Sequence, residues 1–123
     1  MEDTSERMRE AFDPERFRTT GHRLIDQLAD YLSEALRGAP MPVLPWVDPE
    51  IMAAQWPPDF TEDGGGNLNE LLAKIIKEAN HLHHPRYVGH QVSTPLPAAV
   101  LCDLVSSTLN NCIVVYEMGM SGT

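Results

Sequence analysis

With 123 residues, the chain is long enough for one domain with a modest hydrophobic core and too short for two ordinary domains. Its formal net charge of -9 argues against binding to nucleic acid or to an anionic membrane surface. No apolar run approaches the length that crosses a bilayer, and the charged N-terminal residues lack the apolar centre of a signal peptide. These features predict a soluble cytoplasmic protein, in which Cys102 and Cys112 form no disulfide framework.

The N-terminal part of the chain predicts one amphipathic helix over about residues 14–37. Residues 1–12 are charged and are expected to be frayed. Asp13 is a favourable N-cap, and Pro14 suits the first helical position, where its missing N–H costs nothing. Gly38 can take the left-handed conformation that closes a helix. Apolar residues at steps of three and four form one stripe along this helix: Phe17, Gly21, Leu24, Ile25, Leu28, Tyr31, Leu32 and Leu36.

Prolines interrupt the following segment and predict an irregular link. Asp48-Pro49 could start a short turn of helix within it. Trp46 and Trp56 are expected to hold the link against a neighbouring surface, in preference to a binding role. The Gly64-Gly65-Gly66 run is interpreted as a hinge, because a phosphate loop would need a preceding strand and a following Lys-Ser or Lys-Thr.

A second helix is predicted over about residues 68–83. Asn67 and Glu70 have the spacing of a capping box at its start, apolar residues recur with helical spacing, and Pro85 ends the pattern. A third helix is predicted over about residues 95–110.

The third helix would begin with Thr94 as N-cap and Pro95 at the first helical position. Its apolar residues cover nearly the whole circumference, which predicts partners on most sides and therefore a dimer, a piece of a larger protein, or both. The β-branched run at 112–116 favours a short extended segment. The predicted fold class is thus mainly α, with three helices, a Pro-rich irregular link and this extended C-terminal segment.

The segment from His81 to Thr94 holds four of the five histidines and is the best candidate for chemistry. His81 and His84 have the spacing of helical metal ligands, but no carboxylate or cysteine lies near enough in sequence to complete a site. We therefore predict no metal, and interpret these side chains as satisfied or exposed histidines at a helix end. Cys102, in an apolar helix, is expected to be a buried, inert thiol.

Several motifs follow one another in an order that is similar to one enzyme family. They are the first helix (Phe-Arg-Thr-Thr-Gly-His-Arg-Leu-Ile-Asp-Gln-Leu-Ala-Asp-Tyr-Leu), the Pro-rich link, a second helix ending in His-Leu-His-His-Pro-Arg-Tyr, then Gln-Val-Ser-Thr, and Tyr116-Glu117 after Asn-Asn. This series resembles the N-terminal segment of the pyridoxal-phosphate-dependent (group II) amino acid decarboxylases. The family includes the glutamate, cysteine sulfinate and aromatic amino acid enzymes.

The resemblance implies the place of the chain in a larger enzyme. Residues 13–111 would be the helical N-terminal dimerisation domain of a fold-type I enzyme whose whole fold is α/β, and residues 112–123 the start of its large cofactor-binding domain. In the family, pyridoxal phosphate (PLP) forms a Schiff base with a lysine that lies beyond this segment. Lys74 and Lys77 do not lie in that lysine motif, so the 123-residue chain alone is expected to be inactive.

The resemblance also implies which residues contact the substrate. Gln91, Val92 and Ser93, with His90 beside them, match the family segment at the side-chain end of the substrate. Gln-Val-Ser-Thr is close to the glutamate-type pattern, and Gln and Ser offer neutral donors to a carboxylate or sulfinate, which favours an acidic amino acid. Cys112 and Val114 match positions that reach across to the partner subunit's site in a homodimer.

A second hypothesis requires no enzyme. The absence of the catalytic lysine and the complete caps of the three predicted helices also fit a non-catalytic helical dimerisation or regulatory module. Such a module would form a stable dimer on which PLP has no effect.

Overall fold

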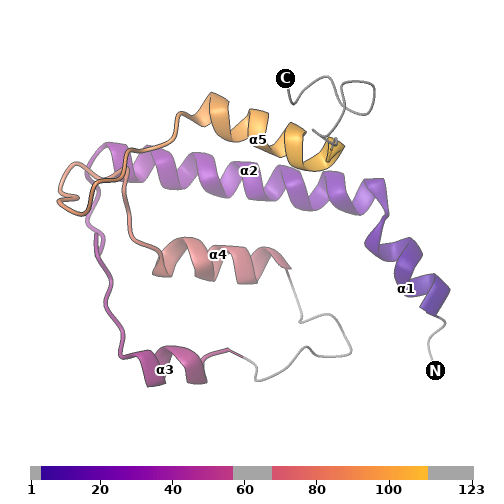
Figure 1. The fold of residues 1–123 in the computed structure, drawn as a ribbon, viewed down its shortest axis with the longest axis horizontal. Helices are drawn as coiled ribbons and strands as arrows, with labels where there is room; N and C mark the ends of the chain where they lie inside the picture. Colours follow the sequence, from indigo (N-terminus) through magenta and orange to yellow (C-terminus); the bar gives the residue numbers. More distant parts are fainter. Residues whose placement is uncertain (1–3, 57–67, 111–123) are drawn as a thin grey trace. The chain divides into compact units, whose positions relative to one another are not determined.

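The computed structural model describes residues 4–56 and 68–110. These residues contain five α-helices and no β-strand (Figure 1). The helices are α1 (Thr4–Ala11), α2 (Pro14–Leu36), α3 (Pro49–Ala54), α4 (Leu68–Glu78) and α5 (Pro97–Leu109). The mainly α fold is confirmed for this part of the chain, but the predicted number of three helices is wrong. Helix α1 was not predicted, whereas α3 is the short turn of helix that Asp48-Pro49 could start. The extended segment predicted at 112–116 lies outside the described residues.

The chain divides after Val88 into two compact units. The first unit holds α1 to α4, and the second holds α5. Part of the N-terminal stretch that was expected to be frayed is helical, since α1 covers most of residues 1–12. No residue of α1 is buried, and its contacts include the hydrogen bond from Arg9 Nη2 to Ser5 Oγ, at 3.3 Å, and the ion pair of Glu10 with Arg16 of α2, at 3.9 Å.

Both ends of α2 are closed by the residues that the sequence indicates. The Asp13 carboxylate accepts hydrogen bonds from the backbone N–H groups of Glu15 and Arg16, at 3.1 and 3.2 Å. At the other end Gly38 has a φ of 71°, its N–H donates to Ala35, and the N–H of Ala39 donates back into the last turn. This pair of bonds is a Schellman motif, which satisfies carbonyl groups that the helix itself cannot.

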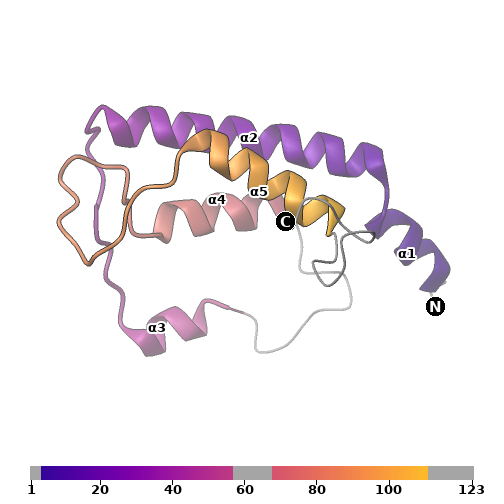
Figure 2. The ribbon, with the colours of Figure 1, turned by 45° about the horizontal axis from the view of Figure 1, so that its top comes forward.

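Helices α2 and α4 pack side by side and run in the same direction (Figures 1 and 2). Their contact rests on a half-buried apolar stripe of α2, in which Ala35 is fully buried. Ala35 is the only buried hydrophobic residue in the described part of the chain. The first unit therefore has a thin core, and many large apolar side chains stay exposed, among them Phe17 at 62%, Ile25 at 42% and Leu36 at 63%.

Helix α4 ends at Glu78, five residues before the predicted end at residue 83. The reason is a tertiary hydrogen bond: the N–H of His81 donates to the carbonyl oxygen of Val43 at 2.9 Å. A donor used in this way cannot continue the helical ladder. The link after α2 thus decides where α4 stops.

Helix α5 begins two residues later than predicted, with Leu96 as N-cap and Pro97 at the first helical position. Proline disfavours the helical conformation of the residue before it, and Leu96 accordingly has a ψ of 134°. The second proline therefore sets the start of the helix, in place of Pro95. At the other end Asn110 takes the left-handed conformation with a φ of 44°, and its N–H donates to Ser106.

The two tryptophans of the irregular link behave differently. The Lys74 ammonium lies 4.7 Å from the centre of the Trp56 ring and 3.5 Å from the Gln55 carbonyl oxygen, so the end of α3 is tied to α4. Trp46 is 80% exposed, so the prediction that it holds the link against a neighbouring surface is wrong for the described part of the chain. No helix among the described residues combines the length and apolar character needed to cross a membrane.

Candidate functional site

The turn after α4 is held by several backbone hydrogen bonds. The N–H of His84 donates to His81 at 3.0 Å, and the N–H of Tyr87 donates to His84 at 2.8 Å. Gly38 packs against this turn, because a Cβ built on Gly38 would lie 3.3 Å from Cγ of Pro85. The end of α2 and the turn after α4 thus form one contact, in which a glycine is required both by its positive φ and by the closeness of the proline.

The side chain of His84 bridges two backbone segments. It is 3% exposed, its Nε2 lies 3.1 Å from the Ala39 carbonyl oxygen, and its Nδ1 accepts a hydrogen bond from the N–H of Arg86 at 3.1 Å. Because Nδ1 accepts, the proton of the neutral ring belongs on Nε2, which donates to Ala39. The prediction of a satisfied histidine holds for His84, in a turn beyond the helix end.

The side chain of His81 is in a different position. It is 4% exposed, and its Nδ1 is buried without a hydrogen-bond partner in the described residues. Its ring lies against Tyr31, with centroids 5.4 Å apart, and the ring of His83 meets the same tyrosine at 6.2 Å. Burial lowers the pKa of His81, and an interaction with the Lys77 backbone only partly opposes this effect. Burial also raises the pKa of Tyr31.

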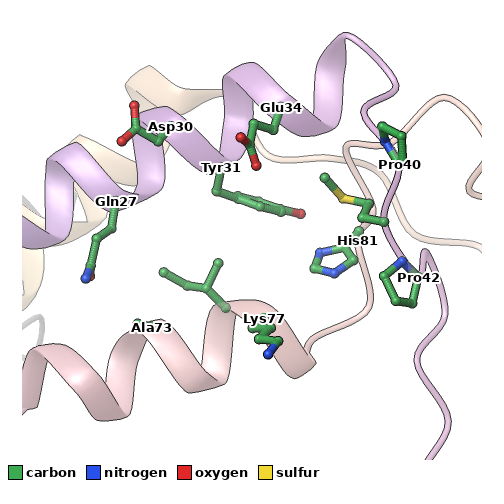
Figure 3. Close-up of a pocket in the computed structure, with 11 residues that line it drawn as sticks. Gln27, Asp30, Tyr31, Glu34, Pro40, Pro42, Ala73, Lys77 and His81 are labelled. Atoms are coloured by element: carbon green, nitrogen blue, oxygen red, sulfur yellow. The ribbon is translucent and has the colours of Figure 1, made fainter.

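His81 and Tyr31 line a cavity of about 470 Å³ between α2, α4 and the start of the link (Figure 3). Its apolar lining comes from both helices and the link: Pro40, Met41, Pro42, Ala73 and Ile76. Its polar lining is Gln27, Asp30, Glu34 and Lys77, besides His81 and Tyr31. Sequence reasoning did not anticipate this cavity, because Tyr31 had been assigned to an apolar stripe. A buried histidine with an unpaired nitrogen is a signal that only the structure contains.

The residues predicted to form a substrate wall lie in the second unit. His90, Gln91, Val92 and Ser93 are all exposed, in a segment without regular secondary structure. The one backbone bond recorded there runs from the N–H of Val92 to the His90 carbonyl oxygen at 2.7 Å and makes a tight turn centred on Gln91. The turn brings these four residues together along the chain, and their assignment to a substrate stays a prediction. Cys112 and Val114 lie outside the described residues.

The prediction that the Cys102 thiol is buried is wrong. In the structure this thiol is exposed on α5. Every residue of α5 is exposed. Among the described residues, no group of three histidine, cysteine, aspartate or glutamate side chains has an arrangement suited to a metal ion.

Comparison with known proteins adds an independent finding. The chain is 31% identical over 101 residues to tyrosine/DOPA decarboxylase 3 of Papaver somniferum, a match that covers 80% of this chain and 18% of that enzyme. It is 28% identical over 101 residues to tyrosine decarboxylase 2 of Narcissus pseudonarcissus, covering 80% of the chain and 20% of the enzyme. The chain is similar to amino acid decarboxylases.

A third relative is phenylacetaldehyde synthase of Arabidopsis thaliana, which is 29% identical over 112 residues, 89% of this chain and 22% of the relative. The chain therefore spans about a fifth of the length of the curated relatives that it matches. No family model matches the chain, and no solved structure matches it. The similarity supports the decarboxylase family that the motifs predict. These matches do not show whether the chain belongs to the glutamate or the cysteine sulfinate branch of that family.

Proposed function

We propose that this chain is the N-terminal segment of a PLP-dependent amino acid decarboxylase. The observation that carries the proposal is the similarity to tyrosine/DOPA decarboxylases over 80% of the chain, within 18% of the relative's length. The motif series of the sequence and the mainly α structure are consistent with it. The enzyme would be cytoplasmic and would release CO2 from an amino acid.

The described residues do not fit PLP itself. A PLP site needs a lysine that is free to form a Schiff base. The Lys74 ammonium is engaged with the Trp56 ring and the Gln55 carbonyl, Lys77 is exposed on α4, and neither lysine lies in the lysine motif of the family that the chain resembles. We therefore assign the cofactor to the part of the enzyme outside this segment, and expect the 123-residue chain alone to be inactive.

The contribution of the segment would be twofold. His90, Gln91, Val92 and Ser93 would form a wall of the substrate site, and Cys112 and Val114 would face the site of the partner subunit. Helices α2 and α5 would supply contacts of a homodimer. Their exposed apolar side chains support this second role, since Ile25, Leu101 and Val105 are 42%, 52% and 57% exposed in the single chain.

The substrate is the finer part of the proposal. The Gln91-Val92-Ser93 segment favours an acidic amino acid, because it offers neutral hydrogen-bond donors. The names of the relatives favour tyrosine and DOPA. We propose an acidic amino acid as the substrate, because of the side chains in this segment. The aromatic amino acids are the alternative that the names of the relatives favour.

The experiment is to express the native gene product in full and to measure CO2 and amine formation with added PLP. Glutamate, aspartate, cysteine sulfinate, tyrosine and DOPA are compared at equal concentration, with the 123-residue chain as the control that should release nothing. Turnover of any of these that depends on PLP supports the decarboxylase, and the preferred substrate decides between acidic and aromatic. A native product with no PLP-dependent turnover would leave the non-catalytic dimerisation module as the better account.

A further inference from the structure

We propose that His84 is a positioning residue for the candidate substrate wall, residues 90–93. It would hold the chain just before this wall against the segment that follows α2, without touching the substrate itself. The inference rests on the proposed function, to which the wall belongs. It adds the residue that limits how freely the wall can move.

The turn after α4 is fastened to the end of α2 and to the link by three contacts, which we call the clasp. The clasp consists of a backbone hydrogen bond of 2.9 Å, a side-chain hydrogen bond of 3.1 Å and a close approach of two rigid residues: His81 to Val43, His84 to Ala39, and Pro85 to Gly38. Figure 3 shows the His81 end of the clasp beside Pro42 of the link. Only the contact of His84 is made by a polar side chain, so a substitution can remove it and leave the backbone of the turn unchanged.

The side chain of His84 holds the turn in two directions. It is 3% exposed, its Nε2 donates to the carbonyl oxygen of Ala39, and its Nδ1 accepts from the N–H of Arg86 at 3.1 Å. The carbonyl oxygen of His84 also accepts from the N–H of Tyr87, at 2.8 Å. These bonds hold the backbone as far as Tyr87. His84 is the last buried residue before the wall in the described part of the chain.

The wall follows the clasp at a short distance along the chain. Val88 and Gly89 are the only residues between Tyr87 and His90. A link of this length lets the Cα atoms of Tyr87 and His90 lie at most about 11 Å apart. The wall also has a turn of its own, because the N–H of Val92 donates to the carbonyl oxygen of His90 at 2.7 Å. The clasp therefore restricts the positions that are open to the wall.

This restriction predicts an effect on affinity. A segment that is already ordered loses less conformational entropy when it contacts a ligand, so it binds more tightly than a free segment of the same sequence. The groups that react with the substrate would lie outside this segment and would not be displaced when the clasp opens. Loss of the clasp should thus weaken substrate binding and spare the chemical step.

The test uses the native gene product in full, with PLP and the amino acid that it decarboxylates best. His84→Ala should raise KM about three- to tenfold and leave kcat within about twofold of the parent. Asp13→Ala is the control, because it removes the N-cap at the far end of α2 and also destabilises the first unit, but does not touch the clasp. It should leave KM unchanged. A purely structural role of His84 would make the two variants alike.

Two conservative variants show which bond of His84 matters, and they keep the test decisive if His84→Ala does not fold. The amide of His84→Gln can donate to Ala39 as the Nε2 of histidine does, whereas the shorter His84→Asn can only accept from Arg86. We expect the parent KM for His84→Gln and a raised KM for His84→Asn.

Gly38→Ala disturbs the clasp from its other side. The new Cβ would lie 3.3 Å from Cγ of Pro85, and Gly38 is far from the wall in the sequence. This variant should also raise KM, because the clasp is its connection to the turn that precedes the wall.

The outcomes separate this inference from the proposed function. A native product without PLP-dependent turnover would overturn the proposed function, and the positioning role with it. Turnover with the same KM in His84→Ala and Asp13→Ala, or in His84→Gln and His84→Asn, would overturn the positioning role alone. A fall in kcat at unchanged KM in the His84 variants would overturn it as well, since the effect would then lie in the chemical step.

Discussion

The Nε2 atom of His84 lies 3.1 Å from the carbonyl oxygen of Ala39, and this contact joins residues that are 45 positions apart in the chain. It connects the turn after α4 to the segment that follows α2. Since Ala35 is the only buried hydrophobic residue described, this polar contact and the backbone bond from His81 to Val43 matter more here than they would in a large core.

Replacing His84 with alanine should therefore destabilise the first unit. The Ala39 carbonyl and the Arg86 N–H would each lose a buried partner, at a cost of about 1 to 3 kcal/mol. Urea unfolding of the 123-residue chain measures the change. His22→Ala, at an exposed position of α2, is the matched control and should stay within about 0.5 kcal/mol of the parent. Equal effects of the two substitutions would contradict the bridging role of His84.

Two glycine substitutions should act in opposite directions. Gly38→Ala should destabilise by about 1 kcal/mol or more, because φ is 71° and the new Cβ would lie 3.3 Å from Pro85. Gly21→Ala should stabilise by about 0.5 to 1 kcal/mol, because Gly21 is inside α2 and its Cβ would meet nothing within 4 Å. Thermal unfolding of both variants measures these changes in stability. A change of the same sign in both would contradict the role of Gly38 in closing α2.

The stability of the first unit should fall as the solution is acidified. Burial lowers the pKa of His81 below its ordinary 6.5, so the unfolded chain takes up the proton more readily than the folded chain. The contribution of His81 to stability is complete above pH 6.5. It is lost as the pH falls through the lower pKa that His81 has in the folded chain. His81→Phe keeps the ring against Tyr31 and removes the titration, so its unfolding free energy should depend less on pH in this window. Parallel pH profiles for the two chains would show that His81 does not contribute.

The proposed homodimer can be tested on the exposed stripe of α2. Ile25 is 42% exposed, and a carboxylate in its place would have to be buried in an apolar interface. Ile25→Asp should weaken the dimer at least about tenfold by sedimentation or light scattering. Ser33→Asp introduces the same negative charge at an exposed polar position of the same helix and should leave association intact. A parent chain that is monomeric at all concentrations would eliminate the dimer.

The thiol of Cys102 offers a second measure of association. It is exposed in the single chain, so a Cys112→Ser variant should react with iodoacetamide at its remaining cysteine without unfolding. If α5 contributes to the homodimer, the reaction should slow as the protein concentration rises. A rate that does not change across the dimer transition would place the interface away from Cys102, whereas a thiol that reacts only in denaturant would contradict its exposure.

The sequence by itself determined the long helix α2, its N-cap Asp13 and its closure at Gly38, because these depend on neighbours within a few residues. It also indicated the decarboxylase resemblance, which the matches to tyrosine/DOPA decarboxylases support. The tertiary structure decided the early end of α4, since the His81 N–H finds Val43 across space. It likewise decided which histidine is satisfied and which is not: His84 reaches Ala39, while His81 is buried against Tyr31 with an unpaired nitrogen. The sequence alone does not distinguish the roles of His81 and His84. Only the packing of α4 against α2 gives the two rings different partners.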